Sequence, residues 1–346
     1  QDYLYTLVVK HPDGEYQPRV IGSMVNYLFA PEDPEAVIET MADPAIKIVS
    51  LTVTEGGYNF HPVSGEFNLD APQVRDDLAH PERPSTSFGL VVEALVRRRA
   101  RGIAPFTVMS CDNIQGNGDV AKRMFSAYAR ARSAELGDWL AAEVAFPNAM
   151  VDRITPVTAP TDIEELSQRF GVEDAWPVVC EPFTQWVLED HFPLGRPAFE
   201  KVGVQVVEDV EPYELMKLRL LNSSHSALSY TAILCKHRFV DDALADPDIF
   251  AFLRAYMSEV VKTISEVQGV NLADYQRTLL ERFSNTYIKD KLSLVGVGGH
   301  ERLRSLPPER RVEVRSQGGS QRLPATASTF WTWRHLLPSS ILLPTK

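Results

Sequence analysis

The chain has 346 residues, a length that suits two ordinary domains. Hydrophobic residues make up 44% of it and charged residues 23%, which is the composition of a folded globular protein and excludes a disordered one. A formal net charge of −11 argues against a surface that binds nucleic acid or an anionic membrane.

The lack of a recognisable membrane span or signal peptide, together with the cysteine usage, leads us to expect a cytoplasmic protein. The sequence has no run of 18 apolar residues, and its first residues lack the basic and apolar regions of a signal peptide. The three cysteines, at positions 111, 180 and 235, are widely spaced in apolar surroundings. Such cysteines are typical of reduced core residues, not of a disulfide frame or a zinc site.

The first part of the chain alternates strand and helix patterns. Residues 3–10 predict a strand, and Pro12-Asp13-Gly14 predicts the turn into a second strand that ends near Ile21. The elements expected next are a helix at 34–41, a strand at 46–54, a helix at 87–99, a strand at 106–110 and a helical stretch at 119–144 that Gly137 can break. This alternation describes a doubly wound α/β domain.

The pattern becomes helical after about residue 207. Residues 146–156 are expected to form a loop held by two prolines, while 176–187 and 201–207 are strand-like. Helices are then expected at 211–236, at 246–267 with Asp246 as its cap, and at 271–283. The sequence therefore predicts an α/β domain over residues 1–207 and a mainly α-helical domain over residues 208–292.

The helix predicted at 211–236 carries the residues on which the functional interpretation depends. Apolar residues surround its axis, so it should be buried; they stand at positions 215, 216, 218, 220, 221, 227 and 228. Among them are Lys217, Asn222 and His225. At about 100° per residue, Lys217 and His225 lie roughly 80° apart and Asn222 lies roughly 60° beyond His225. Three polar groups thus share one sector of a helix that should otherwise be dry.

Burial would give Lys217 a property that catalysis needs. An ammonium in apolar surroundings is costly, and its usual relief is a lowered pKa, which makes the amine a base near neutral pH. Taken singly, a helical lysine is nearly always a solvated side chain, and a helical histidine is more often structural than catalytic. The three residues together, at the spacing Lys-x4-Asn-x2-His, are rarer and favour an active site.

This spacing resembles the signature of the polyol-specific long-chain dehydrogenases, the mannitol 2-dehydrogenase family. The resemblance covers about residues 1–292. It implies that Lys217 is a general base, that Asn222 holds the reacting oxygen and that His225 hydrogen-bonds the substrate.

Two loops that follow strands add to the resemblance. Asn113, in Ser-Cys-Asp-Asn, taken alone would be a turn residue, but the resemblance pairs it with Asn222 as a second amide donor to the reacting oxygen. Val151 and Asp152, in Pro-Asn-Ala-Met-Val-Asp-Arg-Ile-Thr-Pro, match a family segment that lines the polyol site. The alternative for Asp152 is a salt bridge with Arg153.

Two further acidic positions leave alternatives open. Glu55 stands just past the end of the strand at 46–54, where it either passes a proton outward from Lys217 or forms a buried ion pair with it. The segment Cys-Glu-Pro-Phe-Thr-Gln-Trp-Val-Leu-Glu-Asp, residues 180–190, also matches the family. We interpret it as architectural, with Glu181 and Gln185 as candidates to face the site.

The glycine-rich phosphate loop of the family is not found among these residues. Gly296-Val-Gly-Gly299 has the look of a dinucleotide fingerprint, but position 301 is Glu and no βαβ unit follows. The expected fold is therefore an incomplete Rossmann-like domain that lacks its first βα unit, with its cofactor-binding residues unassigned. Residues 293–346 do not resemble the family and are expected to be an aberrant, poorly ordered tail.

The resemblance implies NAD-dependent oxidation of a polyol to a ketose, of the mannitol-to-fructose type, by metal-independent hydride transfer. It leaves open which polyol is used and whether NADP replaces NAD. The expected partner is the small polyol or ketose, and the expected state is a monomer. Two alternatives remain: a hexuronate reductase of the same superfamily, acting on fructuronate or tagaturonate, and an inactive remnant. The surroundings of Asp152 favour a neutral polyol over a substrate that carries a carboxylate.

Overall fold

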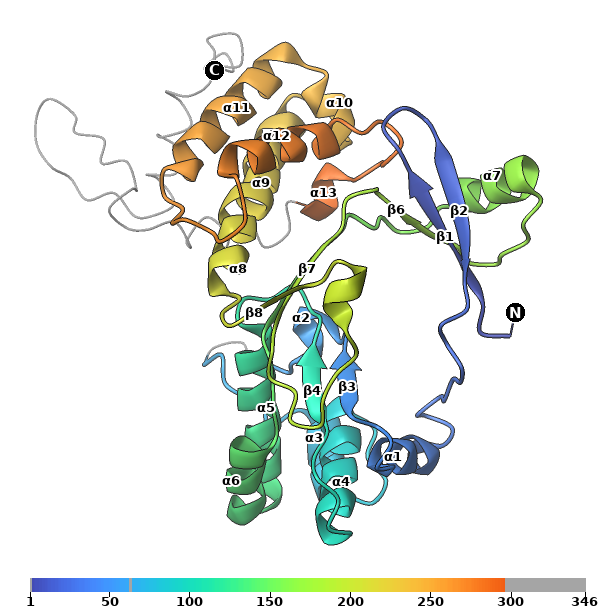
Figure 1. Ribbon diagram of the computed structural model, residues 1–346, viewed down its shortest axis with the longest axis vertical. Coiled ribbons are helices and arrows are strands. Elements are labelled where there is room, and N and C mark those ends of the chain that lie inside the picture. The colour runs from blue at the N-terminus through green and yellow to red at the C-terminus, as the bar shows by residue number, and fades with distance from the viewer. Residues whose placement is uncertain (1, 62–63, 296–346) are drawn as a thin grey trace, which may run out of the picture. The chain divides into compact units, whose positions relative to one another are not determined.

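The computed structural model describes residues 2–61 and 64–295, and the chain divides into two compact units (Figure 1). Unit 1 comprises residues 1–4, 22–153 and 184–211, and unit 2 comprises residues 5–21, 154–183 and 212–346. The α/β pattern followed by helices confirms the predicted fold class. The predicted boundary near residue 208 stays a prediction, because compact units need not coincide with domains of sequence.

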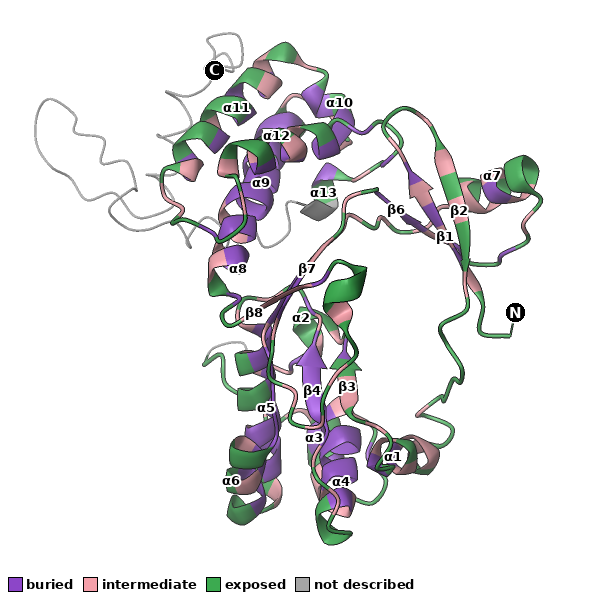
Figure 2. Ribbon diagram, in the orientation of Figure 1, coloured by how far each residue is buried: buried purple, intermediate pink, exposed green. Residues whose placement is uncertain are grey.

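Unit 1 is built around two parallel strands. β3 (Ile48–Leu51) and β4 (Thr107–Ser110) pair with Ile48 opposite Thr107 and Leu51 opposite Ser110, so their carboxyl ends meet at one edge. The short helix α2 (Thr54–Gly57) follows β3 at that edge (Figure 1). β4 is buried along its whole length (Figure 2), as expected for a strand covered on both faces.

Five longer helices complete this part of unit 1: α1 (Pro34–Ala42), α3 (Pro72–Ala79), α4 (Ser87–Ala100), α5 (Asn117–Arg132) and α6 (Ala134–Glu143). Aromatic rings fill the space between them, with Phe88 4.7 Å from Phe125 and 4.8 Å from Phe67 between ring centroids. The buried Arg98 of α4 donates to the backbone carbonyls of Met41, Asp43, Ile46 and Ala104. These bonds tie the end of α1 and the entry to β3 to α4.

The break in the helical stretch after residue 119 is at Ser133, not at Gly137. Ser133 has an extended backbone and its hydroxyl accepts the N–H of Leu136, which makes it the N-cap of α6. Gly137 lies inside α6, where an added Cβ would come within 2.6 Å of the Cβ of Arg130. Its function is therefore close packing of α6 on α5, which Figure 1 shows side by side.

A second sheet of unit 1 contains β5 (Ala149–Asp152), β7 (Gln185–Glu189) and β8 (Gln205–Val207). β5 runs antiparallel to β7, and β8 runs parallel to β7. The prediction of a loop over 146–156 was wrong at its centre, because β5 is a strand only through its pairing with β7. The strand predicted at 201–207 is confirmed only at its end, since a 3₁₀ turn occupies Phe199–Val202.

The sheet of unit 2 joins sequence-distant strands. The hairpin of β1 (Tyr5–Lys10) and β2 (Tyr16–Ile21) is as predicted, and β6 (Val178–Cys180) adds to it in parallel with β1. The sequence patterns did not reveal α7 (Pro160–Phe170). This helix packs on the sheet through Leu166, and its Asp162 accepts a hydrogen bond from the Lys10 ammonium at 2.7 Å.

The remaining helices of unit 2 are α8 (Glu211–Lys217), α9 (Ser223–Leu234), α10 (Val240–Leu244), α11 (Pro247–Val261), α12 (Leu272–Phe283) and α13 (Leu292–Val295). Asp246 caps α11 as predicted, accepting the N–H groups of Asp248 and Ile249, but α11 ends before residue 267. No helix within residues 2–61 and 64–295 is both long and apolar enough to cross a bilayer. The predicted tail, apart from residues 293–295 in α13, and the Gly296–Gly299 segment lie outside the described residues.

Candidate active site

The candidate residues fall into two groups, one in each compact unit. Lys217, Asn222 and His225 belong to unit 2, whereas Glu55, Asn113, Val151 and Asp152 belong to unit 1.

In unit 2, the three predicted residues lie on one continuous helical run. Lys217 is the last residue of α8, and His225 lies in the first turn of α9. Asn222 ends the segment between these helices. All three side chains are buried, with residue exposures of 7% for Lys217, 8% for Asn222 and 6% for His225. The run from 211 to 234 confirms the predicted buried helix, although it ends two residues earlier than expected.

The segment that joins α8 to α9, Leu218–Asn222, is π-helical. A π-helix closes i→i+5 hydrogen bonds, so one turn holds more residues than the α-helical projection assumed. Residues that are five apart, such as Lys217 and Asn222, then come onto one face of the helix. The angular offsets that an unbroken α-helix predicts are therefore wrong across residues 218–222. π-Turns inside α-helices are frequent at functional sites.

α9 is buried although it is rich in hydroxyl groups (Figure 2). Three of its hydroxyls donate to carbonyls four residues earlier: Ser226 to Asn222 at 3.1 Å, Ser229 to His225 at 2.7 Å and Thr231 to Ala227 at 2.6 Å. Such bonds satisfy a polar side chain without a partner outside the helix. They explain how a helix with few large apolar residues remains inside the fold.

The His225 ring stacks on Phe283 of α12, with the ring centroids 4.3 Å apart and the planes 29° from parallel. A stacked ring loses much of its rotational freedom. The orientation of the imidazole is therefore set by α12 as well as by its own helix.

Glu181 has a structural partner in the same unit. Its carboxylate accepts from the Arg282 guanidinium at 2.7 and 2.9 Å and from the N–H of Ile154 at 2.6 Å. The Arg282 guanidinium also lies 3.9 Å from the centre of the Phe183 ring. This buried ion pair joins residues 154, 181 and 282, and it supports the architectural interpretation of the segment.

Near this pair, burial and the Glu181 charge raise the pKa of Asp290 to about 6. Asp290 is half-buried, and its carbonyl accepts the N–H of Val240. No step of the chemistry considered below uses it.

In unit 1, the predicted residues follow strands. Glu55 lies exposed in α2, directly after β3, and Asn113 lies exposed three residues after β4. Because β3 and β4 are parallel, both residues stand at the carboxyl edge of the pair, where α/β folds bind their ligands. Val151 and the buried Asp152 end β5. Gln185 pairs with Asp152 in the sheet, and its side-chain amide donates to Gln205.

Asp112 is a buried residue at this edge that the sequence patterns did not reveal. Its carboxylate accepts the backbone N–H of Thr54 at 2.8 Å, the N–H of Val53 at 3.2 Å and the Tyr58 hydroxyl at 2.8 Å. The Tyr58 hydroxyl also lies 2.6 Å from the hydroxyl of Ser110. Burial, with the Asp112 charge, raises the pKa of Tyr58, so its hydroxyl stays protonated. The only signal in the sequence was an aspartate beside Asn113 directly after a strand.

Asn117, which the sequence patterns also did not reveal, joins β4 to β5. Its fully buried side-chain amide donates to the carbonyl of Asp112 at 3.0 Å and to that of Ala149 at 2.7 Å, and its oxygen accepts the N–H of Ala149 at 2.9 Å. The strand that ends at Asp152 therefore starts from the edge that carries Asn113.

The N-terminus of α5 does not fit a cofactor phosphate. The Asn148 side-chain oxygen accepts the N–H groups of Gly118 at 2.9 Å and Asp119 at 3.1 Å, which are donors that a phosphate would need. The carbonyl oxygen of Pro147 would lie 2.5 Å from a Cβ added at Gly118, so residues 146–148 cover this helix end. We therefore assign no described residue to a pyrophosphate.

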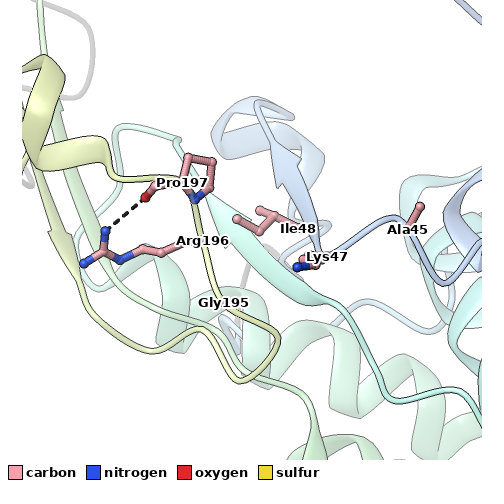
Figure 3. Close-up of a pocket in the computed structure, with 6 residues that line it drawn as sticks. All are labelled: Ala45, Lys47, Ile48, Gly195, Arg196 and Pro197. Atoms are coloured by element: carbon pink, nitrogen blue, oxygen red, sulfur yellow. Dashed lines mark hydrogen bonds between the residues drawn. The ribbon is translucent and has the colours of Figure 1, made fainter.

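A pocket of about 420 Å³ in unit 1 lies at the other end of β3 (Figure 3), lined by Ala45, Lys47, Ile48, Gly195, Arg196 and Pro197. The Arg196 guanidinium already binds Asp190 at 2.7 Å and Glu200 at 2.8 Å, and it donates to the carbonyl of Pro197 at 3.1 Å. Since the pocket adjoins the start of β3, it is separate from the candidate residues of unit 1, which follow the strands' carboxyl ends.

Metal-binding side chains do not gather in the described ranges, where no group of three or more His, Cys, Asp and Glu residues could hold an ion. The three cysteines form no disulfide with one another, and burial, with the charge of Asp112, raises the pKa of the Cys111 thiol to about 11. Cys111 is therefore not an activated thiolate. Metal independence stays a prediction.

Comparison with known protein families gives two matches that together cover most of the chain. Residues 1–201 match the model of the mannitol dehydrogenase Rossmann domain, and residues 209–320 match that of the mannitol dehydrogenase C-terminal domain. The second match extends past residue 292, so the likeness continues beyond the last motif identified in the sequence.

Curated relatives carry the same name. A mannitol 2-dehydrogenase of Phaeosphaeria nodorum is 46% identical over 96% of the chain, and one of Aspergillus fumigatus is 50% identical over 84% of it. The chain spans 59% of the length of each.

Solved structures agree with these matches. Pseudomonas fluorescens mannitol 2-dehydrogenase, in a ternary complex with NAD and D-mannitol, is 51% identical and superposes with a TM-score of 0.80, covering 85% of this chain and 60% of that one. A D-sorbitol dehydrogenase in substrate-free form is 44% identical with a TM-score of 0.84, covering 88% of this chain and 63% of that one.

Proposed function

The chain belongs to the mannitol dehydrogenase family, and on this basis we propose that it oxidises a polyol to a ketose with NAD as the hydride acceptor. The observation that carries the proposal is the set of three buried polar residues, Lys217, Asn222 and His225, on one helical run with a π-turn between the first two. The solved relative in complex with NAD and D-mannitol supports the choice of cofactor and substrate class.

In the proposed reaction Lys217 is the general base. General-base catalysis requires the neutral form of this buried amine. Its Nζ atom takes the hydroxyl proton of the substrate while the carbon that bears this hydroxyl loses a hydride. The products are a ketone, a protonated lysine and the reduced cofactor.

Two amides would stabilise the oxygen as it becomes negative. Asn222 and Asn113 each carry an NH₂ group, and fixed donors around a developing charge stabilise a transition state more than a ground state. In this proposal His225, held against Phe283, and the buried Asp152 with Val151 orient the neighbouring hydroxyls of the polyol. Glu55, exposed at the carboxyl edge of β3, passes the proton from Lys217 to solvent.

NAD, when bound, supplies the hydride acceptor. The carboxyl edge of β3 and β4 is the part of such a fold that receives a dinucleotide. The α5 N-terminus is closed by Asn148, so the proposal gives this helix no part in phosphate binding.

A substrate panel tests the proposal. NADH formation by the 346-residue chain would be measured with mannitol, arabinitol and sorbitol, and the reverse reaction with fructose and fructuronate. We expect a neutral polyol–ketose pair to have the highest kcat/KM. Preference for fructuronate would indicate the hexuronate reductase alternative, and no turnover with any substrate would contradict the proposed activity of this chain.

A further inference from the structure

The turn that carries Glu55 is fastened at both ends by one carboxylate. At its start, Asp112 accepts the N–H groups of Val53 and Thr54, at 3.2 and 2.8 Å. At its end, Asp112 accepts the hydroxyl of Tyr58, the C-cap residue of α2, at 2.8 Å. The four-residue helix between these contacts is too short to be stable by itself, so its place depends on them.

The backbone of the turn is strained at its first residue. Thr54 has a φ of +63°, a conformation that a β-branched residue rarely adopts. Such strain persists only where the surroundings enforce it, and it gathers at functional sites. The hydrogen bond from the Thr54 N–H to Asp112 is the shortest of the carboxylate's two backbone contacts and acts directly at the strained residue.

The same carboxylate belongs to the strand end that presents Asn113. Asp112 immediately precedes Asn113, and its own carbonyl accepts from the buried Asn117. The Ser110 hydroxyl, at the end of β4, lies 2.6 Å from the Tyr58 hydroxyl and accepts the N–H of Asp112 at 3.3 Å. The positions of Glu55 and Asn113 are thus coupled through one residue.

We propose that Asp112 is a positioning residue that holds the Glu55 turn against the strand end of Asn113, and that it thereby controls proton release during turnover. This inference rests on the proposed function, because it acts through Glu55 as a proton relay. Among the described residues, the hydrogen-bond partners of the Asp112 carboxylate are Val53, Thr54 and Tyr58, which belong to the turn, so Asp112 is a positioning residue and not a catalytic one.

The first test is kinetic. Asp112→Asn places an NH₂ group opposite at least one of the three donors, which should displace the Glu55 turn. We expect kcat for polyol oxidation to fall roughly 10- to 100-fold, the range that a small misplacement of an active-site group costs. KM for the polyol should change little, and the pH profile of kcat should shift because the relay is displaced. In a Glu55→Gln background, Asp112→Asn should cause no further loss of kcat, because both substitutions would disable the same path of proton release.

Asp77→Asn is the matched control. Asp77 is also a fully buried carboxylate of unit 1 with several donors, from Ser85 and Thr86, but it lies in α3 and its partners lead into α4, not into the Glu55 turn. We expect Asp77→Asn to lower the unfolding temperature without shifting the pH profile of the folded enzyme. If Asp112→Asn behaves like Asp77→Asn, or if its loss adds fully to that of Glu55→Gln, Asp112 is only structural and the proposal is overturned.

A second measurement does not depend on activity. Hydrogen exchange of the Val53 and Thr54 amides should be faster in Asp112→Asn than in the wild type, while exchange in β4 is unchanged. Tyr58→Phe, which removes one hydroxyl, replaces Asp112→Asn if the latter does not fold. If the wild type lacks dehydrogenase activity, the proposed function fails. Unchanged exchange of the Val53 and Thr54 amides in Asp112→Asn would independently show that Asp112 does not hold the Glu55 turn in place.

Discussion

At the scale of single residues, the candidate site is defined by polar groups that the fold buries at a cost. Lys217, Asn222 and His225 are less exposed than most polar residues, yet they lie on a run whose other side chains form the core of unit 2. Burying a polar group costs free energy unless the group forms hydrogen bonds, so three such groups on one buried run mark this run as the candidate site. Two predictions follow from their assigned chemistry.

Replacing Lys217 by Ala should lower kcat by about 100-fold or more, the scale of losing a general base. Added small amines should restore part of the activity, because they can enter the space that the side chain leaves. Lys262→Ala is the control, since Lys262 is an exposed residue of the same unit that pairs with Glu259. Loss of folding without a kinetic defect in the folded fraction would make Lys217 a structural residue.

Asn222→Ala and Asn113→Ala should each cost about 3 kcal/mol of transition-state stabilisation, the scale of deleting one oxyanion donor. The effect should be on kcat more than on KM, because the donors matter most when charge develops on the oxygen. Asn285→Ala provides the comparison, since this buried amide donates to the carbonyl of Lys10 and should affect stability alone. A change confined to KM in the first two variants would contradict the oxyanion assignment.

At the scale of elements, the π-turn is the feature that an amphipathic pattern does not encode. Hydrophobic spacing indicates that residues 211–236 form a buried helix, and this holds for almost the whole run. The extra residue of the π-turn changes which side chains share a face, and it sits between the proposed base and the proposed oxygen ligand. The relative direction of Lys217 and Asn222 is therefore set by one local insertion.

Inserting an alanine after Leu218 should rotate α8 by about 100° relative to α9. Lys217 would then leave the face that carries Asn222 and His225, so we expect activity to be lost while helical circular dichroism is retained. Leu218→Ala keeps the register and should retain most of the activity. Equal activity in the insertion variant would show that the relative direction of α8 and α9 has no part in the site.

At the scale of the whole molecule, stability depends on contacts between stretches far apart in sequence. Unit 2 is assembled from residues 5–21, 154–183 and the helices after 212, and buried polar contacts join them. Asn285 binds the carbonyl of Lys10, the N–H of Thr6 donates to Asp174 at 2.6 Å, and Arg282 pairs with Glu181. Removing one member of a buried pair leaves the other charged and unpartnered, which is why such contacts hold the parts of the unit together.

Stability should also depend on pH through Asp290. Its pKa in the folded protein is about 6, above the ordinary value of 3.8, so the folded state holds this proton more tightly than the unfolded state. The stabilisation is complete below about pH 4 and is lost as the pH rises through 6. Asp290→Asn should therefore raise the free energy of unfolding at pH 8, by on the order of 1–3 kcal/mol.

Urea unfolding at pH 8 and pH 5 would measure this effect, and the gain should be smaller at pH 5. Asp274→Asn is the control, because Asp274 is an exposed residue that pairs with Arg277 at 3.0 Å. An equal gain at both pH values would show that Asp290 acts through packing and not through its charge.

The sequence by itself determined the features that depend on near neighbours. The β1–β2 hairpin, the Asp246 cap of α11, the buried helical run after residue 211 and the family signature on it were all predictable, because turn chemistry, capping and periodicity act over a few residues. The likeness to known enzymes rests on the same local motifs.

Only the tertiary structure decided the rest. β5 is a strand because β7 lies beside it, Asn117 joins the start of α5 to β5, and the Glu55 turn is fastened by Asp112 from the end of another strand. Each of these depends on a hydrogen bond or a close approach between residues far apart in sequence. Such contacts form only when the chain is folded, so no local pattern of residues predicts them.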